Sequence, residues 1–256
     1  MKGFCRMPLE CFTVPLSNSN AIHNLEDHND RQGWRDFRAR HSTGSLFLVR
    51  DYYAWHQIPY AKPPVGSLRF ADPLPIDSWS KVIDGREEGP KCAQVNFIRF
   101  EPTDVAGSED CLHVNVYAPK QLHDEIIQGK QPKKPVLVYI HAGAYVAGSS
   151  RMGTPGYFMD EDVIFVSFQY RLDILGFLTT GDKIARGNQG LKDQTMALQW
   201  IKKNIEHFGG DPNQIMILGN SAGAASVHQQ MLSPLSKGLF QKAYSQSGAA
   251  SNTWGL

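Results

Sequence analysis

The segment Ile217–Ser226 reads ILGNSAGAAS and places Ser221 between two glycines, Gly219 and Gly223. A serine in this setting can act as a nucleophile in acyl transfer if a strand ends at the first glycine and a helix begins at the serine. The sharp turn between the two elements then lifts Oγ clear of the sheet. The pattern alone is a weak signal, and a serine that caps a helix is the structural alternative. The predicted strand before it and helix after it favour the nucleophile.

Acyl transfer also requires hydrogen-bond donors for the oxyanion that develops in the transition state. One such donor is the backbone N–H that follows the nucleophile, here that of Ala222. The others are expected in a small-residue loop after an earlier strand. Residues 141–144, with the sequence HAGA, directly follow the apolar run at 135–140. Taken alone this loop is also compatible with an ordinary glycine turn.

An alternation of strands and helices is needed to place the serine beside the small-residue loop. The hydrophobic pattern of the sequence predicts such an alternation. Apolar runs favour buried strands, and apolar residues at steps of three or four favour helices. Strands are expected at 45–49, 52–61, 135–141, 162–170, 214–218 and 242–248, and helices at 190–208 and directly after the serine. Gly209 and Gly210 are expected to end the first helix. This order predicts an α/β fold with a mostly parallel sheet and flanking helices.

Length and charge narrow the function classes. The chain has 256 residues, and its 26 basic and 25 acidic side chains leave a net charge of +1, which provides no field to attract nucleic acid or acidic membranes. No apolar stretch is long enough to predict a membrane span. Residues 1–41 are polar and aperiodic and are predicted to be disordered or foreign to a domain formed by residues 42–256. Charged residues and a proline near the start make a poor secretory signal.

The cysteines do not predict a metal site. Cys5, Cys11, Cys92 and Cys111 include no CxxC pair and no histidine at zinc-ligand spacing. A bond between Cys92 and Cys111 would close a loop of about twenty residues and stabilise the fold by roughly 3 kcal/mol. From the spacing, two free core thiols are an equal alternative.

Several segments occur along the chain in a characteristic order, including IPYAKPPVGSLRF, GPKCAQ, SEDCLHVNVYAP, YRLDILGFL, GNSAGAAS and LSPLSKGLFQKAYSQSG. With them the chain resembles the type-B carboxylesterases, a family that includes cholinesterases, juvenile hormone esterases and many insect esterases. The resemblance extends from about Ile58 to Trp254. It implies an α/β-hydrolase fold that ends early at the carboxyl side, with Ser221 as nucleophile and an oxyanion hole formed by Gly143, Ala144 and Ala222.

The resemblance carries further implications for covalent structure and substrate. It implies a disulfide between Cys92 and Cys111, and therefore an oxidising, extracellular compartment. The expected substrate is a small, apolar carboxylic ester, and this chemistry needs neither metal nor organic cofactor. Between the two cysteines lie Phe97 and Phe100 but no Trp, the ring best suited to a quaternary ammonium, so acetylcholine is disfavoured.

Some positions depart from the family pattern. Asn220 stands where Glu or Gln is usual, and His113 where an aromatic residue or Thr is usual. Ala142 replaces a glycine of the oxyanion loop, which would cost about 1 kcal/mol if that position needs a positive φ. Asp173 occupies a position where Gly or Asn is frequent, but aspartate tolerates left-handed turns.

The sequence does not complete a catalytic triad. In α/β-hydrolases the acid and then the histidine follow the serine. From Ala222 to Leu256 there is no Asp or Glu, and the one histidine, His228, is predicted to be a solvated helix residue. His141 matches a structural position of the family. The chain is therefore interpreted as the amino-terminal half of a serine carboxylesterase, inactive or weakly active alone. The alternatives are a non-catalytic adhesion or binding module and a non-functional fragment.

Overall fold

The structure is a computed structural model that describes residues 50–79, 83–96 and 101–253. The side chains of residue 96 and of residues 101–104 are not described. The predictions for residues 1–41 and for a strand at 45–49 lie outside the described residues.

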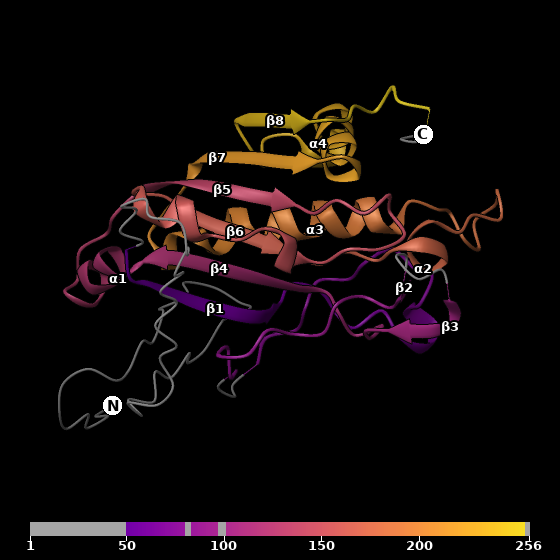
Figure 1. The fold of residues 1–256 in the computed structure, drawn as a ribbon, viewed down its shortest axis with the longest axis horizontal. Coiled ribbons are helices and arrows are strands. Elements are labelled where there is room, and N and C mark those ends of the chain that lie inside the picture. Colours follow the sequence, from indigo (N-terminus) through magenta and orange to yellow (C-terminus); the bar gives the residue numbers. More distant parts are fainter. Residues whose placement is uncertain (1–49, 80–82, 97–100, 254–256) are drawn as a thin grey trace.

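A six-stranded sheet with the order β1-β4-β6-β5-β7-β8 forms the centre of the molecule (Figure 1). Its strands are β1 (Tyr52–Pro59), β4 (His113–Pro119), β5 (Lys134–Ile140), β6 (Ile164–Phe168), β7 (Gly210–Asn220) and β8 (Lys242–Gln246). The four strands from β6 to β8 pair in parallel, whereas β1 and β4 run antiparallel at one side. The predicted mostly parallel sheet is therefore confirmed, and the sequence pattern missed β4.

The helices connect and cover these strands. They are α1 (Lys120–Ile127), α2 (Asp173–Phe177), α3 (Gln189–Asn204) and α4 (Ala222–Leu232). Short 3-10 turns lie at Gly66–Leu68 (η1), Ser150–Met152 (η2), Gly156–Asp160 (η3), Ile205–Phe208 (η4) and Pro234–Ser236 (η5). A separate two-stranded sheet pairs β2 (Gln94–Asn96) with β3 (Glu101–Ala106). Among the described residues, no helix has both the length and the apolar character that a membrane crossing requires.

The long helix α3 agrees with its predicted pattern. Ala197, Leu198 and Ile201 are fully buried, as a period near 3.6 residues requires for one face against the sheet. Its last turn tightens into η4, which ends at Gly209 with φ 85°. A positive φ at this position is the usual reason for glycine after a helix, so the predicted stop is confirmed.

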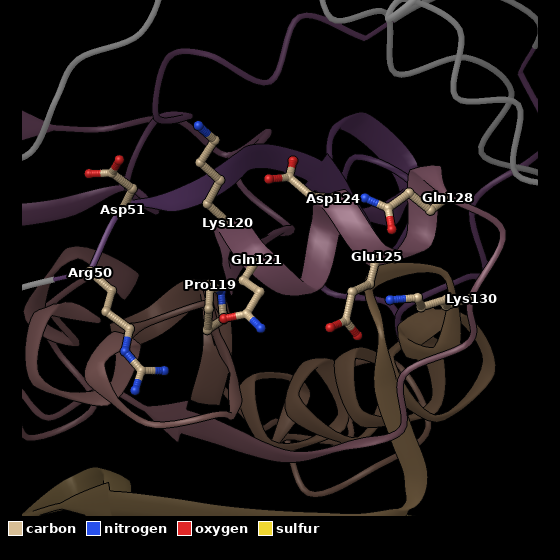
Figure 2. Close-up of a pocket in the computed structure, with 9 residues that line it drawn as sticks. All are labelled: Arg50, Asp51, Pro119, Lys120, Gln121, Asp124, Glu125, Gln128 and Lys130. Carbon is tan, nitrogen blue, oxygen red and sulfur yellow. The ribbon is translucent and has the colours of Figure 1, made fainter.

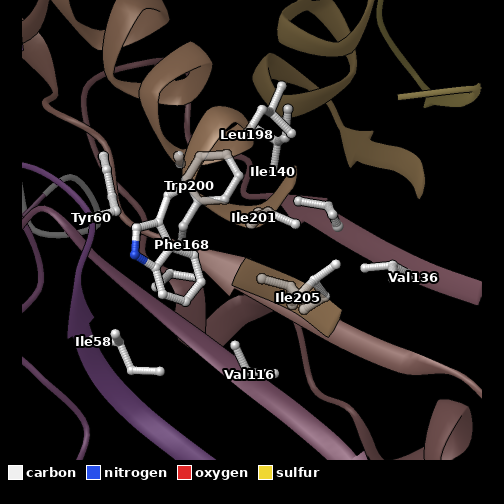
Figure 3. Packing of buried hydrophobic residues seen from close by; sticks show 14 of the residues in the cluster. Ile58, Tyr60, Val116, Val136, Ile140, Phe168, Leu198, Trp200, Ile201 and Ile205 are labelled. Atoms are coloured by element: carbon white, nitrogen blue, oxygen red, sulfur yellow. The ribbon is translucent and has the colours of Figure 1, made fainter. Parts of the chain in front are cut away.

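The main core lies between this helix and the sheet. Leu198, Trp200, Ile201 and Ile205 project toward sheet residues that include Val116 and Val136 (Figure 3). The opposite face of the sheet is covered by η3, where Met159 packs with Tyr117 and Phe165. Successive residues of a strand point to opposite faces of the sheet, so Val116 packs in the main core with α3 and its neighbour Tyr117 packs on the other face with Met159.

A disulfide joins Cys92 and Cys111, which are both buried. This resolves the two alternatives left by their spacing in favour of the bond. The bond closes the loop that contains β2 and β3, because Cys92 lies just before β2 and Cys111 lies just before β4. The two phenylalanines considered for substrate selection, Phe97 and Phe100, lie outside the described residues.

One buried ion pair fixes α3 to the segment between β6 and α2. The guanidinium of Arg171 donates from Nε and Nη2 to the carboxylate of Asp193, at 2.8 and 2.7 Å, and the Arg171 backbone N–H donates to the same carboxylate at 3.0 Å. Nη1 donates to the carbonyls of Arg69 and Ala71. The side chains are 3% and 0% exposed, so the pair is satisfied entirely by protein groups.

Asp193→Asn should lower the free energy of unfolding by about 3–5 kcal/mol, because it leaves the buried Arg171 charge without a counter-ion. Urea denaturation monitored by circular dichroism measures this change. Asp72→Asn is the matched control, since Asp72 pairs with Lys192 while half exposed, and it should cost about 0.5 kcal/mol. Equal losses in the two variants would contradict a structural role for the buried pair.

Candidate active site

Ser221 occupies the turn between β7, which ends at Asn220, and α4, which begins at Ala222. Its backbone has φ 54° and ψ −119°, a conformation that costs a residue with a Cβ about 1–3 kcal/mol. The Ser221 N–H donates to the carbonyl of Gln246 at 2.9 Å, and its own carbonyl accepts from Ala225 at 3.0 Å. The serine is therefore not inside a regular helix, and it is partly exposed.

Two glycines allow α4 to approach the sheet at this turn. A Cβ on Gly219 would lie 2.4 Å from the backbone of Gly223, and a Cβ on Gly223 would lie 2.1 Å from the carbonyl oxygen of Ile140. Neither distance is possible for a real side chain. The two glycines therefore let the backbones of β7, β5 and α4 approach one another directly.

The loop after β5 lies beside this turn. Ile140, the last residue of β5, is the register partner of Gly219 in β7, so both strands end at the same edge of the sheet. Gly143, Ala144 and Tyr145 follow with φ values of 122°, 53° and 62°. The Gly143 carbonyl accepts from the N–H groups of Val146 and Ala147, which closes the loop on itself.

Three backbone N–H groups among the described residues of this region are candidates to bind an anion. Within the described part of the chain, the amides of Gly143 and Ala144 make no hydrogen bond. Ala222 is the first residue of α4, where a backbone N–H has no partner inside the helix. The positive end of the helix dipole adds to the attraction for negative charge at this place.

Ala142 does not carry the strain that its departure from the family pattern suggested. It is not among the described residues with positive φ; the left-handed positions are the next three residues. The predicted cost of about 1 kcal/mol therefore does not arise. Asp173 does have a positive φ, 50°, as anticipated, and its N–H donates to the Tyr145 carbonyl at 2.7 Å.

His141 is a buried structural residue. Its ring stacks on Tyr170 with centroids 4.2 Å apart, and Nδ1 lies 2.9 Å from the Ala142 carbonyl. A carbonyl only accepts, so Nδ1 carries the proton in the neutral ring. Burial lowers the pKa of His141 to about 4, against a weaker opposing effect of the bond to Ala142.

His228 differs from its prediction in one respect. It is only partly exposed, and its Nδ1 accepts the backbone N–H of Ala250 at 3.1 Å. This bond holds the segment after β8 against α4, a contact between residues 22 positions apart that helix periodicity could not reveal. The residue therefore lies on a helix and is partly exposed, as predicted, but its ring also takes part in the packing.

Asn220 contributes a polar contact next to the serine. Its Nδ2 donates to the Gln246 carbonyl at 3.4 Å, the same oxygen that accepts the Ser221 N–H. The amide thus takes part in holding the end of β7 to β8. A carboxylate at this position could not donate to that carbonyl.

Two side chains that sequence reasoning did not single out hold the loop in place. Gln94 Nε2 donates to the Gly148 carbonyl at 2.8 Å, and Gln94 Oε1 accepts the Gly148 N–H at 2.9 Å. The Tyr145 hydroxyl accepts a hydrogen bond from Ser226 in α4. Gln94 lies within the GPKCAQ segment, which carried part of the resemblance and could have drawn attention to it.

A surface hollow lies elsewhere on the molecule. A cavity of about 550 Å³ lies beside α1 (Figure 2), and both basic residues (Arg50, Lys120 and Lys130) and acidic residues (Asp51, Asp124 and Glu125) line it. It adjoins the end of β4, which runs antiparallel to β6 and so reaches the sheet edge opposite the one that bears Ser221. Its lining charges balance, and it is not part of the candidate site. No cluster of three potential metal ligands is found in the described residues.

Comparison with known proteins decides the family. The sequence model of the carboxylesterase family matches residues 41–256. The chain belongs to the carboxylesterase family. It is 50% identical over 207 residues to a juvenile hormone esterase of Tribolium castaneum, covering 80% of this chain and 34% of that protein. It is 44% identical over 233 residues to a carboxylic ester hydrolase of Bombus ignitus, covering 86% and 41%.

A solved carboxylesterase confirms the α/β-hydrolase fold. The crystal structure of juvenile hormone esterase from Manduca sexta with OTFP covalently attached is 36% identical, with a TM-score of 0.71. The match covers 79% of this chain and 38% of that one. The chain thus spans between 34% and 41% of the length of these relatives.

Gly223→Ala should lower the free energy of unfolding by about 3 kcal/mol, because the new Cβ overlaps the Ile140 carbonyl and forces α4 away from β5. Chemical denaturation measures the loss. Gly156→Ala is the matched control, since a Cβ there meets nothing within 4 Å, and it should change stability by less than about 1 kcal/mol. A Gly223→Ala protein as stable as Gly156→Ala would contradict the close approach.

Acid should destabilise the fold through His141. Its pKa is about 4 in the folded chain against 6.5 for a free ring, so the unfolded state binds more protons between these values. Stability should therefore fall as the pH falls from 6.5 to 4, by up to about 3 kcal/mol from this ring. Urea denaturation at pH 7 and pH 4.5 measures the fall, and His141→Gln should show a smaller one. Some dependence should persist, because burial also lowers the His123 pKa to about 4.

Proposed function

We propose that Ser221 is the nucleophile of a serine carboxylic-ester hydrolase. The observation that carries this proposal is its strained backbone, with φ 54° at a turn where two glycines admit the helix. Strain of this kind persists when the surrounding structure over-determines it, and it serves to present a side chain at a functional site. A helix-capping serine would not need it, since caps adopt ordinary extended conformations.

The N–H groups of Gly143, Ala144 and Ala222 form the oxyanion hole in this proposal. When the Ser221 oxygen adds to an ester carbonyl, the C=O bond becomes a C–O single bond and negative charge gathers on its oxygen. Fixed amide dipoles at the edge of the sheet stabilise that charge without reorganising. The base that takes the Ser221 proton returns it to the departing alkoxide as the intermediate collapses, which releases the alcohol and leaves an acyl-serine that water then hydrolyses.

Activation of the serine requires a base from outside the described residues. Within the part of the chain that the structure describes, the Ser221 hydroxyl makes no hydrogen bond to a histidine; His141 bonds through Nδ1 to the Ala142 carbonyl and His228 through Nδ1 to the Ala250 N–H. Loss of the base in a serine hydrolase lowers turnover by about a millionfold. We therefore propose that these 256 residues alone hydrolyse esters weakly or not at all.

The expected substrate is a small, apolar carboxylic ester. The names of the relatives, juvenile hormone esterase and carboxylic ester hydrolase, agree with that class. The Cys92–Cys111 disulfide supports an oxidising environment, and hence an extracellular site of action.

A fluorophosphonate should label Ser221, and mass spectrometry of the digested protein should locate the adduct. We expect slow labelling of the unmodified chain, faster labelling with imidazole as an external base, and none with Ser221→Ala. Ser251→Ala, which removes an exposed hydroxyl of the neighbouring segment, is the matched control and should be labelled like the parent.

Two results would count against the proposal in different ways. An adduct that survives Ser221→Ala would place the nucleophile elsewhere. Rapid labelling that imidazole does not accelerate would show that a base is already present within the chain.

A further inference from the structure

The hydroxyl of Tyr145 joins the oxyanion loop to the helix that follows the serine. Ser226 Oγ, which is fully buried in α4, donates to the Tyr145 hydroxyl at 3.2 Å. The hydroxyl in turn lies 3.3 Å from Gln229 Oε1, to which it donates. Ser226 also accepts from Gln194 Nε2 of α3 at 3.0 Å. A chain of polar contacts therefore leads from α3 through α4 to the loop.

The rest of Tyr145 is held from the other side. Its carbonyl accepts the Asp173 N–H at the start of α2, and its ring lies 5.0 Å from that of Phe177. With φ 62°, the residue is also the last of three consecutive positions with positive φ, Gly143 to Tyr145. Contacts from two helices thus determine where this backbone turn sits.

The Tyr145 hydroxyl bonds to a residue close in sequence to one proposed oxyanion donor, and Tyr145 itself is adjacent to another. Tyr145 directly follows Ala144, and Ser226 lies one helical turn beyond Ala222. The contact between Tyr145 and Ser226 therefore links the segment with two of the proposed oxyanion donors to the helix with the third. A small relative movement of the two would separate the three amides, and hydrogen-bond donors act only at the distance of the developing charge.

We propose that Tyr145 is a positioning residue that fixes the oxyanion loop against α4, an inference that rests on the proposed function. It does not touch the reacting atoms. Its hydroxyl sets the distance between donors on separate elements, and its ring fills the space beside Phe177. These two roles are separable, because phenylalanine would keep the ring and lose both hydrogen bonds.

Tyr145→Phe should loosen the loop without unfolding the protein. Loss of its two neutral hydrogen bonds to α4 predicts amide hydrogen exchange at least about fivefold faster in residues 142–148. With fluorophosphonate and imidazole, the maximal labelling rate of Ser221 should fall by about fivefold, while the reagent concentration for half-maximal rate stays unchanged. Ser226→Ala removes the Ser226–Tyr145 bond from the helix side, together with the Gln194 bond, and should change both quantities in the same direction.

Tyr157→Phe is the matched control, because it makes the same chemical change at a tyrosine that is 65% exposed. It should leave exchange and labelling as in the parent, and thermal melting of each variant should verify folding. Unchanged exchange and an unchanged maximal rate in both Tyr145→Phe and Ser226→Ala would overturn the inference. Absence of labelling in the parent would instead overturn the proposed function, whereas the exchange rates would still report whether the hydroxyl holds the loop.

Discussion

The absence of space for a side chain between α4 and the ends of β5 and β7 governs the arrangement of the site. A Cβ on Gly223 would overlap the Ile140 carbonyl oxygen, and a Cβ on Gly219 would overlap the Gly223 backbone. The helix therefore begins in direct contact with two strand ends, and Ser221 has to turn with a positive φ to join them. The strain at the serine is a consequence of this backbone contact.

That strain is offset by interactions that converge on the turn from β8. The Gln246 carbonyl accepts from the Ser221 N–H and from the Asn220 side chain, so β8 holds the final residues of β7 in line. His228 then fixes the segment after β8 to α4 through Ala250. The turn is enclosed by neighbours on each side, which is the condition under which a rare backbone conformation persists.

The sequence predicted the local elements of the site and missed the contacts between them. The strand before Ser221, the helix after it and the loop after β5 each have a pattern confined to a few neighbouring residues. The β4 strand was missed because its apolar run, in HVNVYAP, is interrupted by Asn115, whose side chain bonds to Ser150. Gln94 and Tyr145 were missed because they act on residues 54 and 81 positions away, a separation that no periodicity encodes.

The proposed oxyanion hole is built from main-chain groups, so the sequence controls it through backbone conformation. A Cβ on Gly143 would lie 1.9 Å from the Ala147 carbonyl, and a Cβ on Gly148 would lie 2.3 Å from the Ala142 carbonyl. These two glycines are required by packing as well as by φ. Ala142 has no positive φ and is not restricted in this way. Ala144 has a positive φ although it carries a Cβ, because contacts of the adjacent Tyr145 with α2 and α4 hold the turn in place. The departure at Ala142 therefore leaves the donor geometry intact, whereas a side chain at Gly143 would destroy it.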